Sequence, residues 1–432
     1  MNLREKTIKG LTWMFSQQLV IQIINISVQI ILARILEPEI FGLIAMVFIL
    51  ISIGQNLMDA GMTSSIIRTN KPCEKDYSTV FITNIFISFI FYIIIFLFSP
   101  IIADFYNQPI LDLVIKVLAL NFIIRSLSAV HLAKLTKEMN FKQIAKFQVP
   151  SYIFGGIVAI LLALYDYKIW SLVFMHLVQS LVFTVQNWLF IKWKPSLFFS
   201  VEKFKYHFNF GYKITFSSIL GAVFANSFNV VIGKLFTPIQ TGFFNHANVY
   251  RLFPPGQLSS VVEKVVYPMF SEIKDRFLLL QNYKKILKFL FATILPIMLL
   301  SIIIAEELFL IVFGAKWLPA VPFFQILAVA SIFKPIGMYS TNILKVTNKP
   351  DLILKFQIIS NLIGLVLLLG MFSFGITYIA YSIVLSSIIT ALLHMWISGK
   401  QINYSLFLHI KDLFKIFISG TLTFLITISI KI

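Results

Sequence analysis

The sequence is poor in charged residues, since Asp, Glu, Lys and Arg together make up only 12% of its 432 positions. A soluble domain usually carries about a quarter of such residues to keep its surface hydrated. Hydrophobic residues account for 58%, many of them in long runs. Such a chain satisfies its backbone by crossing a lipid bilayer as helices, which excludes a soluble globular protein.

Acidic residues and cysteine are also scarce. The 18 Asp and Glu stand against 36 Lys and Arg, and the single cysteine, Cys73, cannot form an intramolecular disulfide. The six histidines show no helical spacing suited to a metal, and no phosphate-binding Gly-rich Lys motif is present. We therefore expect no enzyme activity, metal or cofactor. The energy source would be an ion gradient, the membrane potential or the substrate's own gradient.

The long apolar runs predict an all-α polytopic membrane protein with about thirteen transmembrane helices. The eighth of these is the weakest, because it is rich in polar residues and contains the break Pro254-Pro255-Gly256. The expected spans are 10–33, 41–66, 77–98, 110–133, 147–164, 169–191, 209–234, 240–270, 286–312, 318–344, 353–372, 374–397 and 411–430.

Lysine and arginine predict the orientation of these spans. Most of them lie at the N-terminus and in the segments that follow every second span, and few lie on the opposite side. The excess of positive charge on cytoplasmic loops places the N-terminus in the cytoplasm and the C-terminus outside. The same distribution argues against nucleic-acid binding, because the basic residues form no domain of their own.

Parts of the chain recur. The turn that contains Pro38 and Gly42 returns around Pro238 and Gly242, and a Lys-Phe-Gln sequence opens both the fifth and the eleventh predicted spans. Both copies start on the same side, so the repeat is parallel, as in two-lobed transporters. We expect a six-helix bundle over residues 1–200, its repeat over 201–400, and an additional helix over 401–432.

Positive charges lie inside the predicted spans and outnumber negative ones there. A charge in mid-membrane costs roughly 3 kcal/mol on insertion scales, so it normally faces a cavity or a partner. Arg125 and Lys334 are separated by the repeat distance and would reach the same depth; Arg251 and Lys213 add to the set. This excess favours an anionic ligand. The alternative is that each cation extends to the interface or pairs with a carboxylate.

Amide side chains form a stripe on the first predicted span. Gln18, Gln22 and Asn25 follow one another at helical spacing, and Asn226 lies in the seventh span, the repeat-related helix. These residues would line a wet cavity for a sugar. The alternative is that they form hydrogen bonds between packed helices.

Asp59 is the acidic residue placed most clearly inside a span. One interpretation is that it pairs with a cavity cation such as Arg125 or Arg251 and changes partner between inward- and outward-open states. The other is a fixed ion pair that holds two helices together.

Three segments carry a family resemblance: Lys9-Gly10 before Trp13, the turn at 37–42, and the sequence Asp-Ala-Gly-Met-Thr-Ser-Ser-Ile-Ile-Arg at 59–68. They resemble the polysaccharide transporters of the multidrug/oligosaccharidyl-lipid/polysaccharide exporter superfamily, which include the Wzx-type O-antigen and capsule flippases. The resemblance implies two six-helix bundles facing one another across a V-shaped cavity.

By the same resemblance, the substrate would be an undecaprenyl-diphosphate-linked oligosaccharide that moves between leaflets of the bacterial inner membrane. Membrane lipid and polysaccharide polymerase or assembly proteins would be its partners. We hypothesise that Arg125, Arg251, Lys213 and Lys334 bind the diphosphate, because cationic donors match phosphate oxygens, and that Gln18, Gln22, Asn25 and Asn226 form part of the polar wall.

Rival functions remain. A multidrug cation antiporter of the same superfamily would need buried carboxylates, of which the chain offers mainly Asp59. A peptidoglycan-precursor flippase would share the diphosphate and is poorly separated by sequence. A membrane polymerase or ligase would need a sizeable external loop, and none is predicted.

Overall fold

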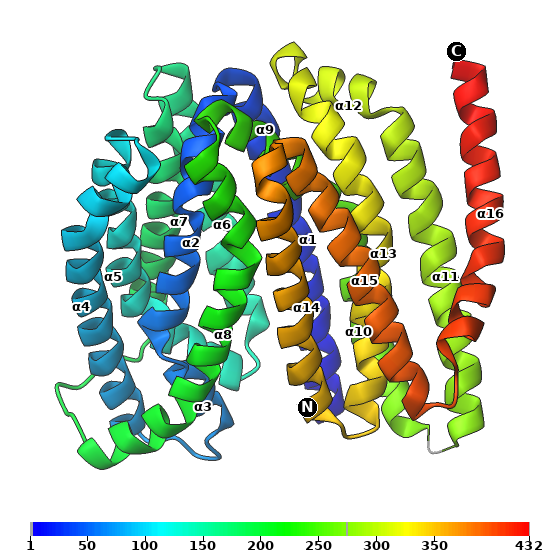
Figure 1. Ribbon diagram of the computed structural model, residues 1–432. Helices are drawn as coiled ribbons and strands as arrows, with labels where there is room; N and C mark the ends of the chain where they lie inside the picture. Colours follow the sequence, from blue (N-terminus) through cyan, green and yellow to red (C-terminus); the bar gives the residue numbers. More distant parts are fainter. Residues whose placement is uncertain (1–2, 274, 432) are drawn as a thin grey trace. The chain divides into compact units, whose positions relative to one another are not determined.

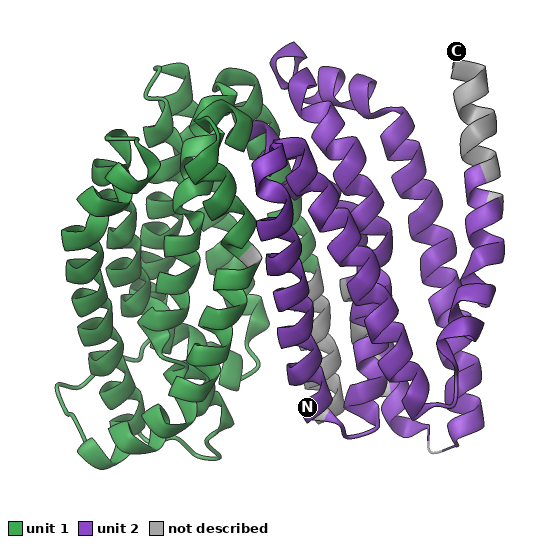
Figure 2. Ribbon diagram, in the orientation of Figure 1, with its two compact units in different colours: residues 1–241 green, residues 242–432 purple. Residues whose placement is uncertain are grey.

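The computed structural model describes residues 3–273 and 275–431, and over these residues it is a set of helices without strands (Figure 1). Most helices are joined by short turns, and a longer loop over 191–200 joins α7 to α8. The chain divides into two compact units, residues 1–241 (unit 1) and 242–432 (unit 2) (Figure 2). The predicted class, an all-α polytopic membrane protein, is confirmed.

Unit 1 holds the first eight helices, so it includes the helix that the sequence repeat grouped with the second half. Within it, α5 packs against α4 and α7, α6 packs against α1 and α7, and α8 packs against α2, α3 and α4. The helices are α1 (Leu3–Ile35), α2 (Pro38–Asp59), α3 (Met62–Arg68), α4 (Glu74–Tyr106), α5 (Ile110–Lys137), α6 (Phe141–Leu164), α7 (Ile169–Phe190) and α8 (Val201–Leu235).

Unit 2 is centred on α13, which packs against α10, α11 and α15, while α16 packs on α11. Its first helix, α9, begins just before the boundary between the units. The remaining elements are α9 (Pro238–Arg251), α10 (Phe253–Glu272), α11 (Arg276–Ile303), α12 (Ala305–Val312), the 3-10 helix η1 (Ala315–Ala320), α13 (Val321–Val346), α14 (Pro350–Met371), the 3-10 helix η2 (Phe372–Phe374), α15 (Ile376–Gln401) and α16 (Leu406–Lys431).

Ten of the described helices are long and apolar enough to cross a membrane, or eleven if the two parts of bent α8 count as one span. The predicted eighth span is not continuous: α9 ends at Arg251, and a new helix starts at Phe253. Proline is favoured in the first turn of a helix, so Pro254 and Pro255 suit the start of α10. The count of thirteen spans stays a prediction.

Local sequence accounts for several helix ends. The hydroxyl of Ser200 accepts a hydrogen bond from the backbone N–H of Lys203 at 3.3 Å and starts α8, and Asn140 caps α6 through the N–H of Gln143. Asn107, with φ of 54°, ends α4 in the left-handed conformation that Asn tolerates. Capping residues therefore set the lengths of these helices.

A break separates α2 from α3. Ala60 and Gly61 both take left-handed backbone angles, with φ of 43° and 67°. A side chain at Gly61 would also collide with α8, because a Cβ there would lie 2.4 Å from the carbonyl oxygen of Gly211. Glycine at positions 61 and 211 lets the backbone of α8 approach the break closely.

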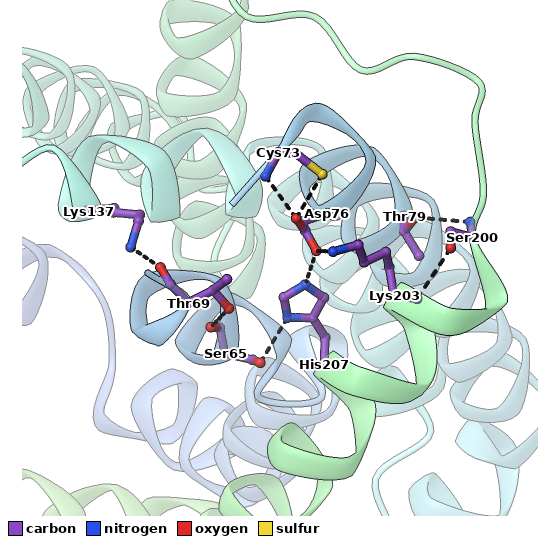
Figure 3. A network of polar contacts seen from close by, with 9 residues as sticks. All are labelled: Ser65, Thr69, Cys73, Asp76, Thr79, Lys137, Ser200, Lys203 and His207. Carbon is purple, nitrogen blue, oxygen red and sulfur yellow. Dashed lines mark hydrogen bonds and ion pairs between the residues drawn. The ribbon is translucent and has the colours of Figure 1, made fainter. Parts of the chain in front are cut away.

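A network of hydrogen bonds and an ion pair also fixes the start of α8 (Figure 3). Inside it, the fully buried His207 lies 2.8 Å from Ser65 Oγ and 3.1 Å from Asp76 Oδ1. Lys203 reaches the same carboxylate at 3.1 Å, and the backbone N–H of Cys73 donates to its other oxygen at 2.8 Å. The network joins α8 to both α3 and α4.

Unit 2 contains a similar arrangement at the start of α16. His409 is fully buried, and its Nε2 lies 3.2 Å from the hydroxyl of Tyr283 on α11. That hydroxyl also lies 3.1 Å from Ser340 Oγ. Each helix that follows a predicted six-helix repeat is thus held by a buried histidine in its first two turns.

Candidate functional site

Unit 1 encloses a cavity of about 360 Å³ between α2, α3, α5, α6 and α7. We call it the unit 1 cavity. Its described lining includes the cation Arg125, the carboxylate of Asp59, several hydroxyl side chains and three amides. The side chains that matter most below are Asp59, Arg125, Gln55, Gln148, Tyr152 and Gln179.

Arg125 reaches the cavity from α5 and is only lightly anchored. Its Nε donates to Ser180 Oγ on α7 at 3.2 Å. Among the described residues, no carboxylate lies within 4 Å of it and no acceptor bonds its two terminal amino groups. The guanidinium therefore keeps most of its five N–H donors for a ligand.

Asp59 lines the same cavity but does not pair with Arg125. Its Oδ1 accepts from the backbone N–H of Thr63 at 3.0 Å and from Asn84 Nδ2 at 3.3 Å, and its Oδ2 accepts from the Thr63 hydroxyl. The left-handed break after Asp59 turns the start of α3 back toward the carboxylate and supplies the two donors of Thr63, while Asn84 comes from α4. The predicted Asp59–Arg125 pair is therefore not formed, and a pair with Arg251 would join the two units and stays a prediction.

Unit 2 buries a cation of its own. Arg251, at the end of α9, is 7% exposed, and its bonds go to neutral groups: Asn248 Oδ1 at 2.9 Å, the Leu327 carbonyl at 3.3 Å and Ser331 Oγ at 3.2 Å. Lys334 lies one turn beyond Ser331 on α13, where its charge interacts with that of Arg251. Neither cation has a carboxylate within 4 Å among the described side chains.

Arg125 belongs to unit 1, whereas Arg251 and Lys334 belong to unit 2. The structure brings Arg125 together with Asp59, and Arg251 together with Lys334. The predicted chamber shared by Arg125 and Lys334 would involve both units and stays a prediction.

The other predicted residues lie elsewhere. Lys213 is exposed on α8 beside the ring of Tyr212, and Asn226 donates to Ser52 Oγ at 3.2 Å, which joins α8 to α2. The stripe on α1 formed by Gln18, Gln22 and Asn25 is exposed or half-buried and is not part of the described lining of the unit 1 cavity. A substrate-binding role for these residues stays a prediction.

Sequence reasoning missed most of the polar lining of the cavity. Gln148, Ser151 and Tyr152 recur at helical spacing on α6, and Gln179 and Ser180 face them from α7. The spacing on α6 was a usable signal. Close packing explains the position of Gln179, since a Cβ at Gly155 would lie 2.3 Å from its Cγ.

Comparison with known sequences gives several matches. A family model described as "Polysaccharide biosynthesis protein" matches residues 31–322. The chain is 26% identical over 361 residues to the lipopolysaccharide biosynthesis protein WzxC of Escherichia coli K12, a match that spans 83% of this chain and 73% of that protein. It is 23% identical over 369 residues to the teichuronic acid biosynthesis protein TuaB of Bacillus subtilis 168, spanning 84% and 76%.

Solved structures share the fold. The lipid II flippase MurJ in an inward closed conformation superposes with a TM-score of 0.77 at 16% identity, over 96% of this chain and 91% of that one. An inward-facing multidrug resistance transporter of the MATE family, within the MOP superfamily, gives a TM-score of 0.69 at 16% identity, over 89% and 94%. At these identities the likeness shows the fold alone.

Proposed function

The chain belongs to the polysaccharide biosynthesis protein family, and from this premise we propose that it is a flippase for a lipid-linked oligosaccharide. The resemblance found in the sequence is thereby confirmed at the level of the family. The proposed substrate is a glycan on an undecaprenyl-diphosphate carrier, moved from the inner to the outer leaflet of the bacterial inner membrane. The protein would act as a transporter without enzyme activity, with its N-terminus in the cytoplasm.

The observation that carries this proposal is the positive charge of Arg251 and Lys334, which no carboxylate among the described residues pairs within 4 Å. The described hydrogen-bond partners of the buried Arg251 are all neutral, and burying a cation without a counter-ion is costly. A diphosphate would supply the missing negative charge. Arginine suits it because the planar guanidinium makes two parallel bonds to phosphate oxygens.

The same charges count against a multidrug cation antiporter. Such a protein would need a buried carboxylate to take up a cation. In the described lining of the unit 1 cavity Asp59 is the one carboxylate, and the cation Arg125 lines the same cavity. A flippase for a peptidoglycan precursor would share the diphosphate site. The two flippase functions are separated by phenotype, since loss of a peptidoglycan precursor flippase would prevent growth, and loss of a surface-polysaccharide flippase would remove the polysaccharide.

To test the proposal, a strain lacking the gene would be complemented with Arg251→Gln, Arg251→Lys or Lys334→Gln. We expect both Gln variants to lower surface polysaccharide by tenfold or more, on the order of the loss of one charge-assisted bond. Arg251→Lys keeps the positive charge but loses the planar guanidinium that makes two parallel bonds, so we expect an intermediate level of surface polysaccharide. Lipid-linked glycan should accumulate in the inner leaflet.

The matched control is Lys355→Gln, which removes an exposed cation from α14 of the same unit. Protein abundance is measured for every variant. Export at the wild-type level by Lys334→Gln and Arg251→Gln, at normal abundance, would overturn the assignment of the diphosphate to these cations.

A further inference from the structure

We propose that the unit 1 cavity is a subsite for one or two sugar rings of the transported glycan and does not receive the diphosphate. The inference rests on the proposed flippase function and concerns the part of the substrate that unit 1 would bind.

The charge of the cavity argues against a diphosphate. Its described lining contains one cation, Arg125, and one anion, Asp59, so the two charges cancel. A diphosphate carries about two negative charges, and placing it here would leave both uncompensated in a poorly hydrated bundle. Burying unpaired charge costs several kcal/mol per ion. A ligand without charge avoids this cost.

The hydrogen-bonding groups of the cavity match sugar hydroxyls. Each hydroxyl donates one bond and accepts others, so a sugar site must offer both donors and acceptors. The free N–H groups of Arg125 donate, the carboxylate of Asp59 accepts, and the amides of Gln55 and Gln179 do both. Asp59 is held in place by Thr63, which fixes its acceptor lone pairs before a ligand arrives.

Size and shape agree with the same ligand. The volume of about 360 Å³ lies at the low end of the range of roughly 300–1,000 Å³ typical of small-molecule sites. Such a volume suits one or two sugar rings and not a long lipid tail. The rings of Tyr152 and Phe183 also line the cavity and offer flat apolar surface for the C–H face of a pyranose.

Gln179 is the residue best suited to a test. It faces the cavity from α7, and none of its polar atoms is bonded to a described group, so its removal should disturb the ligand more than the fold. Gln179→Leu keeps the volume and removes the amide. Gln55→Leu is the second variant, in case the first fails to fold.

The experiment measures the affinity of purified protein in nanodiscs for two sets of probes. One is undecaprenyl diphosphate without sugar; the other is the same carrier bearing a single glucose, galactose or N-acetylglucosamine. We expect the wild type to bind at least one sugar-bearing carrier more tightly than the bare carrier. Gln179→Leu should reduce that preference roughly tenfold, as expected for one or two lost hydrogen bonds, and leave the affinity for the bare carrier unchanged.

Three outcomes would overturn the inference. The wild type could show no preference for any sugar-bearing probe, both glutamine variants could keep the preference, or Gln179→Leu could weaken the bare carrier equally, which would place the diphosphate in the cavity. The variant Arg251→Gln tests the proposed diphosphate site separately from the sugar site. It should lower the affinity for the bare carrier and for the sugar-bearing carrier by the same factor. If it weakens neither, the diphosphate site is wrong, and the effect of Gln179→Leu still decides the sugar site. Free glucose as a competitor distinguishes recognition of the sugar itself from recognition of the lipid-linked form.

Discussion

Replacing Gly211 by alanine should detach α8 from the break between α2 and α3. A Cβ at this position would lie 2.2 Å from the carbonyl oxygen of Ala60 and 2.9 Å from the carbonyl carbon of Gly61, so it meets backbone that cannot rotate away. Overpacking of this kind costs about 1–3 kcal/mol. The variant should therefore unfold at a lower temperature in detergent, as measured by intrinsic fluorescence, and export less polysaccharide.

The same helix provides the control. Gly221 has nothing within 4 Å of the position that a Cβ would take, and alanine is favoured over glycine in a helix by about 1 kcal/mol. Gly221→Ala should therefore leave the apparent Tm unchanged or raise it. Equal shifts of Tm for the two variants, in either direction, would refute the contact between α8 and the break.

Further predictions concern topology and the buried histidines. Cys73 is exposed and is the single cysteine of the chain, so a membrane-impermeant maleimide should label it in inside-out vesicles and not in intact spheroplasts. Cys73→Ala is the unlabelled control. Labelling in intact spheroplasts would contradict the predicted cytoplasmic N-terminus. His207→Ala should lower the Tm, at a cost of about 1–3 kcal/mol, because it removes the side-chain partner of the buried Ser65 hydroxyl and one of the hydrogen bonds of Asp76. His207→Phe, which fills the space without restoring the bonds, should not rescue it. His409→Ala should have a similar effect in unit 2 through Tyr283, and an unchanged Tm for both alanine variants would count against the docking role of these histidines.

The sequence was sufficient for the class of fold, because long apolar runs have few solutions in a bilayer. It also predicted that Arg125 lies in a membrane helix, and α5 is long and apolar enough to cross a membrane. The same prediction for Arg251 stays a prediction, because α9 is not among the helices of that length and composition. The described hydrogen-bond partners of both arginines are neutral, and their binding of an anionic ligand stays a prediction.

The sequence did not predict the hydrogen-bond partners of Asp59 or the faces of α6 and α7 that line the unit 1 cavity. Asp59 was expected to meet a cation, yet two of its three hydrogen bonds come from Thr63, just after the break, and the third comes from Asn84 on α4. The break depends on the left-handed angles of Ala60 and Gly61, which hydropathy does not reveal. The rotation of α6 and α7 about their axes places Gln148 and Gln179 at the cavity, and this rotation depends on packing contacts far apart in the chain. The division of α9 from α10 was signalled by two prolines, but the repeat suggested a continuous span.

The paired histidines bear on the ancestry of the chain. If the two halves descend from a duplicated gene, the copied piece extended beyond six helices. The reason is that α8 and α16, the helices that follow the two predicted six-helix bundles, each carry a buried, hydrogen-bonded histidine near their start. Such a breakpoint would leave each daughter copy with its own closing helix. Because α8 is also the counterpart of α1 in the sequence repeat, it would close the first copy and open the second.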